Sequence, residues 1–134
     1  MPERKSPPPD IIAKTRLVAL DLPEAYEEPA WTGVRWCVGK KNFAQLVMID
    51  GGWPPAFAKA AGTDGPACVL TFRVAAAEIA APRLSRAPYF RPVWFKDIAG
   101  LVLDEGTDWD EVEARIVGSY RVLAPKRLAA LLDR

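Results

Sequence analysis

The last third of the chain places the strongest limits on what it can fold into. An apolar run over residues 98–103 predicts a buried strand, and the acidic segment after it predicts the start of a long helix. Thr107 or Asp108 is expected to cap that helix, and Glu111 follows Asp108 at the spacing of a capping box. The predicted inward face consists of Trp109, Val112, Ile116, Tyr120 and Leu123.

Earlier in the chain, short apolar runs bounded by glycine, proline or asparagine predict strands. Residues 34–38 and 43–49 are two such runs, and the turn residues 39–42 between them predict a β-hairpin with a basic tip. Residues 67–72 predict a third strand of the same kind. The alanine-rich segment 74–81 predicts a helix, because alanine has the highest helix propensity.

The two ends of the chain complete the predicted architecture. Asp10 is expected to cap a first helix, and Pro125 is expected to end the long one, since proline cannot continue the helical hydrogen bonds. A last short helix is predicted over residues 126–132, with its leucines facing inward. The fold class is therefore α+β, a single antiparallel sheet with helices packed on one face. Residues 10–134 are expected to form one domain after a disordered tail, residues 1–9.

The absence of histidine removes the commonest general base and the commonest metal ligand. Ser-His-Asp, Cys-His and HExxH sites are therefore excluded. The two cysteines, Cys37 and Cys68, lie in apolar surroundings, which favours buried thiols over a redox pair or a nucleophile. Two thiols alone do not make a zinc site. We expect no catalytic residues, no metal and no cofactor, and hence a protein that is not an enzyme.

The formal net charge of +1 hides an uneven distribution of charge along the chain. Between Arg35 and Lys96 there are nine basic and three acidic residues, whereas from Asp104 to Glu113 there are six acidic residues and no basic one. This asymmetry favours an anionic partner for the middle of the chain. No apolar run reaches the roughly 18 residues needed to span a bilayer, and no signal-peptide core is visible. We expect a cytoplasmic protein without a membrane partner.

The predicted hairpin tip contains the first candidate binding residues, Lys40, Lys41 and Asn42. Two lysines on a tight turn can reach phosphate groups, and an asparagine can add a hydrogen bond. Solvated lysines at a hairpin tip are equally ordinary in proteins that bind no nucleic acid. Arg73, Arg83 and Arg86 either extend this basic surface or pair with the acidic residues of the segment 104–113.

A second candidate is the segment 89–96, in which basic and aromatic residues alternate. Arg91 and Lys96 are candidates for phosphate contacts, and Trp94 is a candidate for stacking on a base or wedging between bases. Single-stranded nucleic acids are bound by this combination, because aromatic rings stack on bases while cations follow the backbone. The alternative is that the aromatic side chains belong to the hydrophobic core.

Three segments resemble, in the same order, parts of one protein family. They are LPEAYEE followed by Trp31, VGKKNFA at residues 38–44, and GSYRVLAPK at residues 118–126. In the family these are an acidic segment before the first strands, a glycine-lysine hairpin tip, and a helix that ends in Ser-Tyr and a lysine-containing turn. The chain therefore resembles the MmcQ/YjbR-like proteins over about residues 10–132.

This resemblance implies a CyaY-like fold, in which helices pack on one face of an antiparallel sheet. Members of the family are commonly described as DNA-binding proteins with a double-wing motif, which implies double-stranded DNA as the partner. Many relatives carry a His-Trp pair in the strand before the last helices, where this chain reads Val93-Trp94-Phe95. A role that depends on that histidine does not carry over to this chain.

The residues and the resemblance together predict a non-enzymatic DNA-binding protein that uses the hairpin tip and the aromatic-basic segment. Sequence-specific readout is not expected, because no helix presents arginine, asparagine and glutamine on one outward face. The alternative is a protein-interaction or small-ligand module with an aromatic patch. That patch would consist of Trp31, Trp36, Trp53 and Trp94. The sequence leaves the oligomeric state open.

Overall fold

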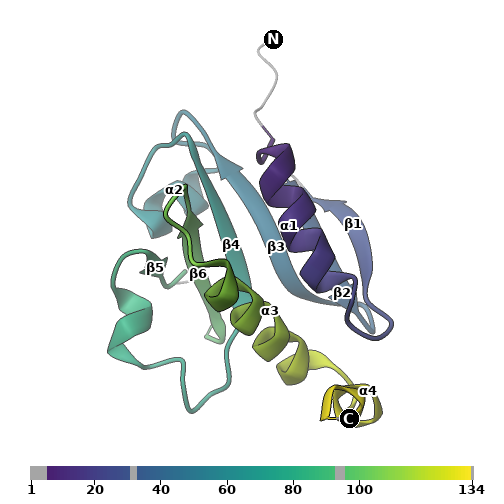
Figure 1. Cartoon of the computed structure of the whole chain (residues 1–134). Coiled ribbons are helices and arrows are strands. Elements are labelled where there is room, and N and C mark those ends of the chain that lie inside the picture. Colours follow the sequence, from purple (N-terminus) through teal and green to yellow (C-terminus); the bar gives the residue numbers. More distant parts are fainter. Residues whose placement is uncertain (1–5, 31–32, 93–95, 134) are drawn as a thin grey trace.

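The computed structural model describes residues 6–30, 33–92 and 96–133, which form an antiparallel sheet with helices packed against it (Figure 1). Within these residues the sheet has six strands in the order β1-β2-β3-β4-β6-β5. The predicted α+β class is thereby confirmed. The elements are α1 (Pro9–Ala19), β1 (Tyr26–Ala30), β2 (Gly33–Val38), β3 (Lys41–Ile49), α2 (Pro55–Ala61), β4 (Ala67–Arg73), the 3-10 helix η1 (Pro82–Ser85), β5 (Tyr89–Phe90), β6 (Ile98–Leu103), α3 (Trp109–Leu123), α4 (Lys126–Ala129) and the 3-10 helix η2 (Ala130–Asp133).

The main hydrophobic core lies between the sheet and the helices α1 and α3, which cover the same face (Figure 1). Successive side chains of a strand point to opposite faces, so every second residue of the central strands enters this core. Leu46, Leu70 and Leu101 belong to one buried cluster with Ile116 and Tyr120 of α3. Burying each of these side chains stabilises the fold by about 1.5–3 kcal/mol.

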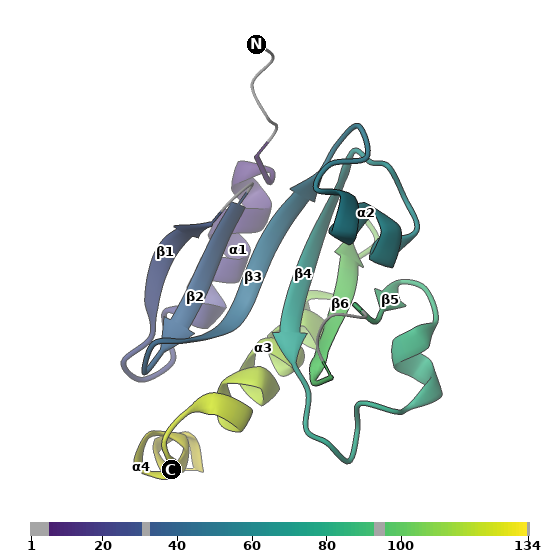
Figure 2. The same cartoon turned by 180° about the vertical axis from the view of Figure 1, so that it is seen from behind.

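The opposite face of the sheet is covered only in part, by the short helix α2 and by β5 (Figure 2). Ala58 of α2 packs there in a second cluster with Val47, Val69 and Phe90. Gly100 allows this packing, because a Cβ atom at that position would lie 2.2 Å from the Phe90 ring. The prediction that helices pack on one face thus describes α1 and α3, while α2 covers one end of the other face.

Helix α3 confirms the most detailed sequence prediction. The Asp108 carboxylate accepts hydrogen bonds from the backbone N–H groups of Asp110, at 3.0 Å, and Glu111, at 3.4 Å. These bonds satisfy two of the amide groups that every helix start leaves without a partner. The Glu111 carboxylate, predicted to complete a capping box, instead pairs with the guanidinium of Arg83.

Two predictions of helical structure are wrong in detail. The segment 74–81 forms turns, in which the Ile79 N–H bonds to the carbonyl oxygen of Ala75 at 3.1 Å, and η1 follows at Pro82. A helix of that length has too few hydrogen bonds to offset the cost of its first turn, whatever its alanine content. Leu131, predicted to face inward, is 41% exposed because η2 replaces the end of the predicted last helix.

The start of the first helix also differs from its prediction. Helix α1 begins at Pro9, its N-cap is Pro8, and no side chain caps it, so the prediction of Asp10 as the cap is wrong. Proline suits this position, because its missing N–H would have no partner in the first turn of a helix. Asp10 lies within that turn, where its charge is favourable to the helix dipole. Of the predicted disordered tail, residues 1–5 lie outside the described residues.

Candidate nucleic-acid interface

The turn between β2 and β3 projects Lys40 from the end of the sheet. Gly39 and Lys40 both have positive φ angles, 55° and 67°, as the common two-residue hairpin turn requires. Glycine adopts this conformation without strain, whereas Lys40 carries a side chain into it. Lys41 and Asn42, predicted as turn residues, are instead the first residues of β3. Both lysine side chains are exposed.

The lysines of this turn differ from several arginines of the chain in how their charge is balanced. Among the described residues, no carboxylate forms an ion pair with Lys40 or Lys41. Three arginines of the predicted basic region are paired: Arg35 with Glu28, Arg73 with Asp97, and Arg83 with Glu111. The predicted pairing with the acidic segment 104–113 is therefore confirmed for Arg83 alone, and Arg86 forms no ion pair among the described residues. The lysine turn, which we define as Gly39 and Lys40 with the adjoining Lys41, therefore has no counter-charge among the described residues.

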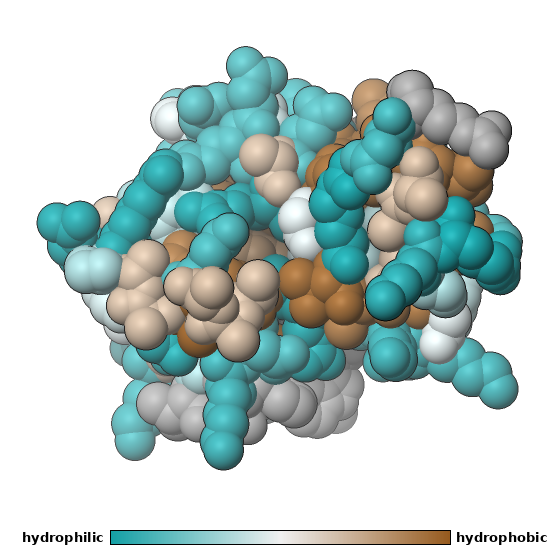
Figure 3. Space-filling view, turned by 90° about the horizontal axis from the view of Figure 1, so that it is seen from below, coloured by the Kyte–Doolittle hydropathy of each residue, from teal (hydrophilic) through white to brown (hydrophobic). Residues whose placement is uncertain are grey.

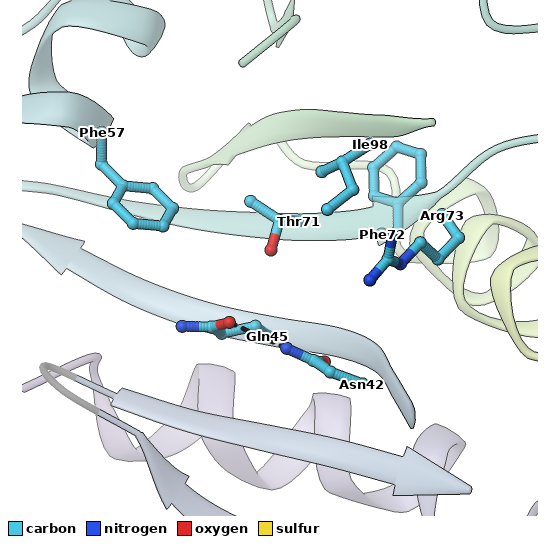
Figure 4. A pocket seen from close by; sticks show the side chains of 7 residues that line it. All are labelled: Asn42, Gln45, Phe57, Thr71, Phe72, Arg73 and Ile98. Atoms are coloured by element: carbon cyan, nitrogen blue, oxygen red, sulfur yellow. Dashed lines mark hydrogen bonds between the residues drawn. The ribbon is translucent and has the colours of Figure 1, made fainter. Parts of the chain in front are cut away.

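Beside the turn, the sheet face opposite the main core carries a shallow hollow of about 200 Å³, which we call the polar hollow. Its lining consists of four polar and three apolar residues: Asn42, Gln45, Thr71 and Arg73, and Phe57, Phe72 and Ile98. The side-chain amide of Asn42 donates to the amide oxygen of Gln45 at 2.9 Å along β3. Thr71 and Arg73 reach toward these amides from β4 (Figure 4). Arg73 also donates to the Asp97 carboxylate at 2.9 Å. The polar hollow therefore offers amide, hydroxyl and guanidinium groups next to unpaired lysines.

The sequence analysis considered Arg73 for the basic surface but missed two other polar members of the polar hollow, Gln45 and Thr71. Each lies on a strand whose other face enters the main core, so its side chain points away from that core. The sequence does show a polar residue between apolar neighbours at each of these positions, which indicates a side chain on the face away from the core. That signal does not show which strands are neighbours, and here Gln45 lies directly opposite Thr71 in the register of β3 and β4.

The described aromatic residues of the predicted 89–96 segment, Tyr89 and Phe90, belong to the core. Tyr89 and Phe90 are 5% and 6% exposed, because β5 pairs with β6 and lays both rings against neighbouring residues. The Tyr89 ring packs edge-on against Phe72, with 6.3 Å between ring centroids. Stacking of bases on Tyr89 or Phe90 is therefore excluded, and the core interpretation is confirmed for Phe90.

The remaining candidates of this segment have different positions. Lys96 is exposed and precedes β6, whereas Arg91 is half-buried with its Nε enclosed and without a hydrogen-bond partner among the described residues. Trp94 lies outside the described residues. Because β3 and β6 both pair antiparallel with β4, the lysine turn before β3 and Lys96 before β6 lie at the same end of the sheet. Figure 3 shows this end, where hydrophilic side chains project between smaller hydrophobic patches.

The aromatic patch expected for a protein-interaction module is not formed as predicted. Trp36 is fully buried, and its indole N–H donates to the Glu27 carboxylate at 2.9 Å. Trp53 is half-buried beside a tight turn, and Trp31 and Trp94 lie outside the described residues. Trp36 therefore stabilises the fold and cannot contact a partner.

The Ser-Tyr pair of α3 also has a structural role. The Ser119 hydroxyl accepts from the Arg73 N–H at 2.7 Å and donates to the carbonyl oxygen of Phe43. The Tyr120 hydroxyl donates to the carbonyl oxygen of Pro23 at 2.7 Å. These bonds fasten α3 to β3, to β4 and to the segment before β1, and neither hydroxyl is available for chemistry.

The thiols of Cys37 and Cys68 are free and buried, as predicted. Burial, assisted by the Glu28 carboxylate, raises the pKa of Cys37 to about 11. Burial also raises the pKa of Cys68 to about 12, with a further contribution from Asp10. Both thiols therefore stay protonated at neutral pH, and a protonated thiol is a poor nucleophile.

No described helix has both the length and the apolar character needed to cross a bilayer. In the same ranges, no three cysteine, aspartate or glutamate side chains gather as metal ligands.

Comparison with known proteins gives two matches. The family model described as YjbR matches residues 20–122. A crystal structure of a protein from Pseudomonas syringae, solved as a structural-genomics target, superposes with a TM-score of 0.61 at 13% identity, covering 87% of this chain and 98% of that one. At this identity the likeness shows the fold alone. No curated protein matches the sequence significantly.

Proposed function

The chain belongs to the YjbR family, as its three characteristic segments predicted, and we propose that this member is a non-enzymatic protein that binds double-stranded DNA. The contact surface is the end of the sheet that carries Lys40, Lys41 and Lys96. One observation carries the proposal: the charges of the turn lysines are unpaired where several arginines of the chain are neutralised. An arginine that already pairs with a carboxylate gains little electrostatic energy from a phosphate. An unpaired lysine that neutralises a phosphate releases counterions from the DNA, and this release favours binding.

Each part of the surface has a distinct role in this proposal. Lys40 and Lys41 contact phosphates from the hairpin tip, and Lys96 contacts a further phosphate across the end of the sheet. Asn42 and the polar hollow supply hydrogen bonds to phosphate or sugar oxygens. Arg91 is a secondary contact, because part of its guanidinium is enclosed.

Binding of this kind depends on charge and is independent of base sequence. Helix α3 packs one face on the sheet, and its first turn carries Asp110 and Glu111. Carboxylates are repelled by the phosphates that line the major groove, so α3 is unsuited to enter it. A role for Trp94 as a stacking or wedging residue remains a prediction.

The test is a titration of the protein into a fluorescent random-sequence DNA duplex, followed by anisotropy at about 50 and 200 mM salt. Three phosphate contacts predict that the affinity falls about 40-fold between these two concentrations, from a slope of roughly 0.9 per phosphate. Absence of binding at the lower salt concentration, where electrostatic attraction is strongest, would contradict the proposal.

A further inference from the structure

A larger hollow, of about 590 Å³, lies at the opposite end of the sheet from the lysine turn, between α1, the start of α3 and the ends of three strands. We propose that this hollow, the helix-side hollow, binds a small molecule with an apolar body and one cationic group. The inference is independent of DNA binding, because it rests on different residues at a different end of the molecule.

The floor of the helix-side hollow is apolar and continuous across three strands. Met48, Cys68 and Leu103 lie side by side, because Met48 pairs with Cys68 in the register of β3 and β4, and Cys68 pairs with Leu103 in that of β4 and β6. All three point to the face that carries the main core. The floor is therefore the end of that core, in which Cys68 and Leu103 are buried and Met48 is partly buried.

The walls give the helix-side hollow the size and character of a small-molecule site. Ile11 of α1 and Trp109 of α3 line it from two sides, and both are only partly buried. Small-molecule sites in proteins typically measure about 300–1,000 Å³ and are mostly apolar, with a few polar groups that fix orientation. An apolar ligand body would bury the exposed parts of Ile11, Trp109 and Met48.

The rim selects the charge of the ligand. Three exposed carboxylates line it, those of Asp10, Asp104 and Glu105, against the single ammonium group of Lys14. Lys14 lies 5.2 Å from the centroid of the Trp109 ring, so the indole face already attracts a cation in this position. The Asp10 carboxylate contributes to the raised pKa of Cys68, which indicates that the negative field extends to the floor.

The helix starts at this end do not reverse that preference. The N-termini of α1 and α3 each carry a partial positive charge of about half a unit, which favours anions. Asp10 balances the first of these, and Asp108 caps the second. Asp104 accepts a bond from the Gly106 N–H at 2.8 Å, and Glu105 has no partner among the described residues. The rim therefore keeps an excess of negative charge, which complements a cation.

The experiment compares two probes of similar shape and opposite charge, 2-phenylethylamine and 3-phenylpropanoate. Each is titrated into the ¹⁵N-labelled full chain, and the indole N–H signal of Trp109 is followed by NMR after assignment with a Trp109→Phe variant. We expect saturable shifts with the amine and binding at least about tenfold weaker with the carboxylate, because like charges repel at the rim.

A variant pair tests the role of the rim. Asp104→Asn combined with Glu105→Gln removes two charges at exposed positions, and we expect it to weaken amine binding about fivefold to tenfold. Glu113→Gln, a change at an exposed acid of α3 outside the hollow, is expected to leave the affinity unchanged. Equal affinity for the two probes, no saturable shift with the amine, or equal effects of the two variants would each overturn the proposal.

Discussion

Glu27 and Lys40 belong to neighbouring parts of one sheet, but only the charge of Glu27 is balanced by an ion pair within the described residues. Glu27 accepts hydrogen bonds from the guanidinium of Arg16, at 2.8 and 2.9 Å, and from the indole of Trp36. Lys40 stands exposed on a turn without a carboxylate partner among the described residues. The first charge is balanced within the protein, whereas the second has no counter-charge among the described residues.

The comparison extends to the three segments that identify the family. The first and the last of them meet in space, because the Tyr120 hydroxyl donates to the carbonyl oxygen of Pro23. Arg127, which directly follows the last segment, adds a hydrogen bond from its guanidinium to Glu24 at 3.0 Å. These contacts join the start of the sheet to the last helices. The remaining segment, residues 38–44, forms the lysine turn and contributes exposed charges. The segments that resemble the family therefore include both residues that stabilise the fold and residues with exposed charges.

The largest effect on stability is expected from Ser119→Ala. The substitution leaves the Arg73 N–H and the Phe43 carbonyl without their partner in a site where Ser119 is fully buried. Unsatisfied buried polar groups are costly, so we expect the free energy of unfolding to fall by about 2–3 kcal/mol. Chemical denaturation followed by circular dichroism measures this change.

The adjacent residue provides the control. Gly118 is exposed within α3, and a Cβ atom there meets nothing within 4 Å. Gly118→Ala should therefore raise the free energy of unfolding by up to about 1 kcal/mol, from helix propensity alone. If Ser119→Ala proved as harmless as this neighbour, the buried bonds would not fasten α3 as described.

A smaller effect, with a characteristic pH dependence, is expected from Glu27→Gln. The hydrogen bond from Arg16 lowers the pKa of Glu27 in the folded protein, so its stabilising contribution is present above the unfolded pKa of about 4.3 and is lost as pH falls through the folded value. We expect the variant to lose about 1 kcal/mol at pH 7. The difference from wild type should shrink below about pH 4. A difference that stayed constant with pH would contradict this account.

The smallest effect on stability is expected from Lys40→Gln combined with Lys41→Gln. Both side chains are exposed, and glutamine keeps a Cβ at the positive φ of Lys40, so the strain of the turn does not change. We expect the free energy of unfolding to change by less than about 0.5 kcal/mol. A larger loss in the same denaturation experiment would show that the lysines have structural partners.

Sequence patterns predicted correctly those helices and strands that are specified by residues within the element itself. Strand β6 has the predicted bounds, and α3 has its predicted cap, because an apolar run and a capped amphipathic helix specify these elements locally. Strand β5 has only two residues and depends on pairing with Gly100 and Leu101 of β6. No local pattern specifies such a pairing. The helix predicted over residues 74–81 does not form, because helix propensity alone does not stabilise so short a segment.

The candidate site was predictable to the same extent. Exposure of Lys40 and Lys41 follows from turn chemistry, which the sequence shows directly. The polar hollow requires the register that places Gln45 opposite Thr71, and a one-residue shift would move these side chains to the other face. The ion pair between Arg73 and Asp97 likewise joins residues that only the folded chain brings together.

The most direct test of the account compares two double variants in the DNA anisotropy titration. Lys40→Gln with Lys41→Gln removes two lysine charges at the turn, and Lys14→Gln with Lys59→Gln removes two from α1 and α2, away from it (Figure 2). We predict that the slope of log affinity against log salt falls by about 1.8 for the turn variant and stays near the wild-type value for the control. Equal slopes for the two variants would contradict binding through the lysine turn.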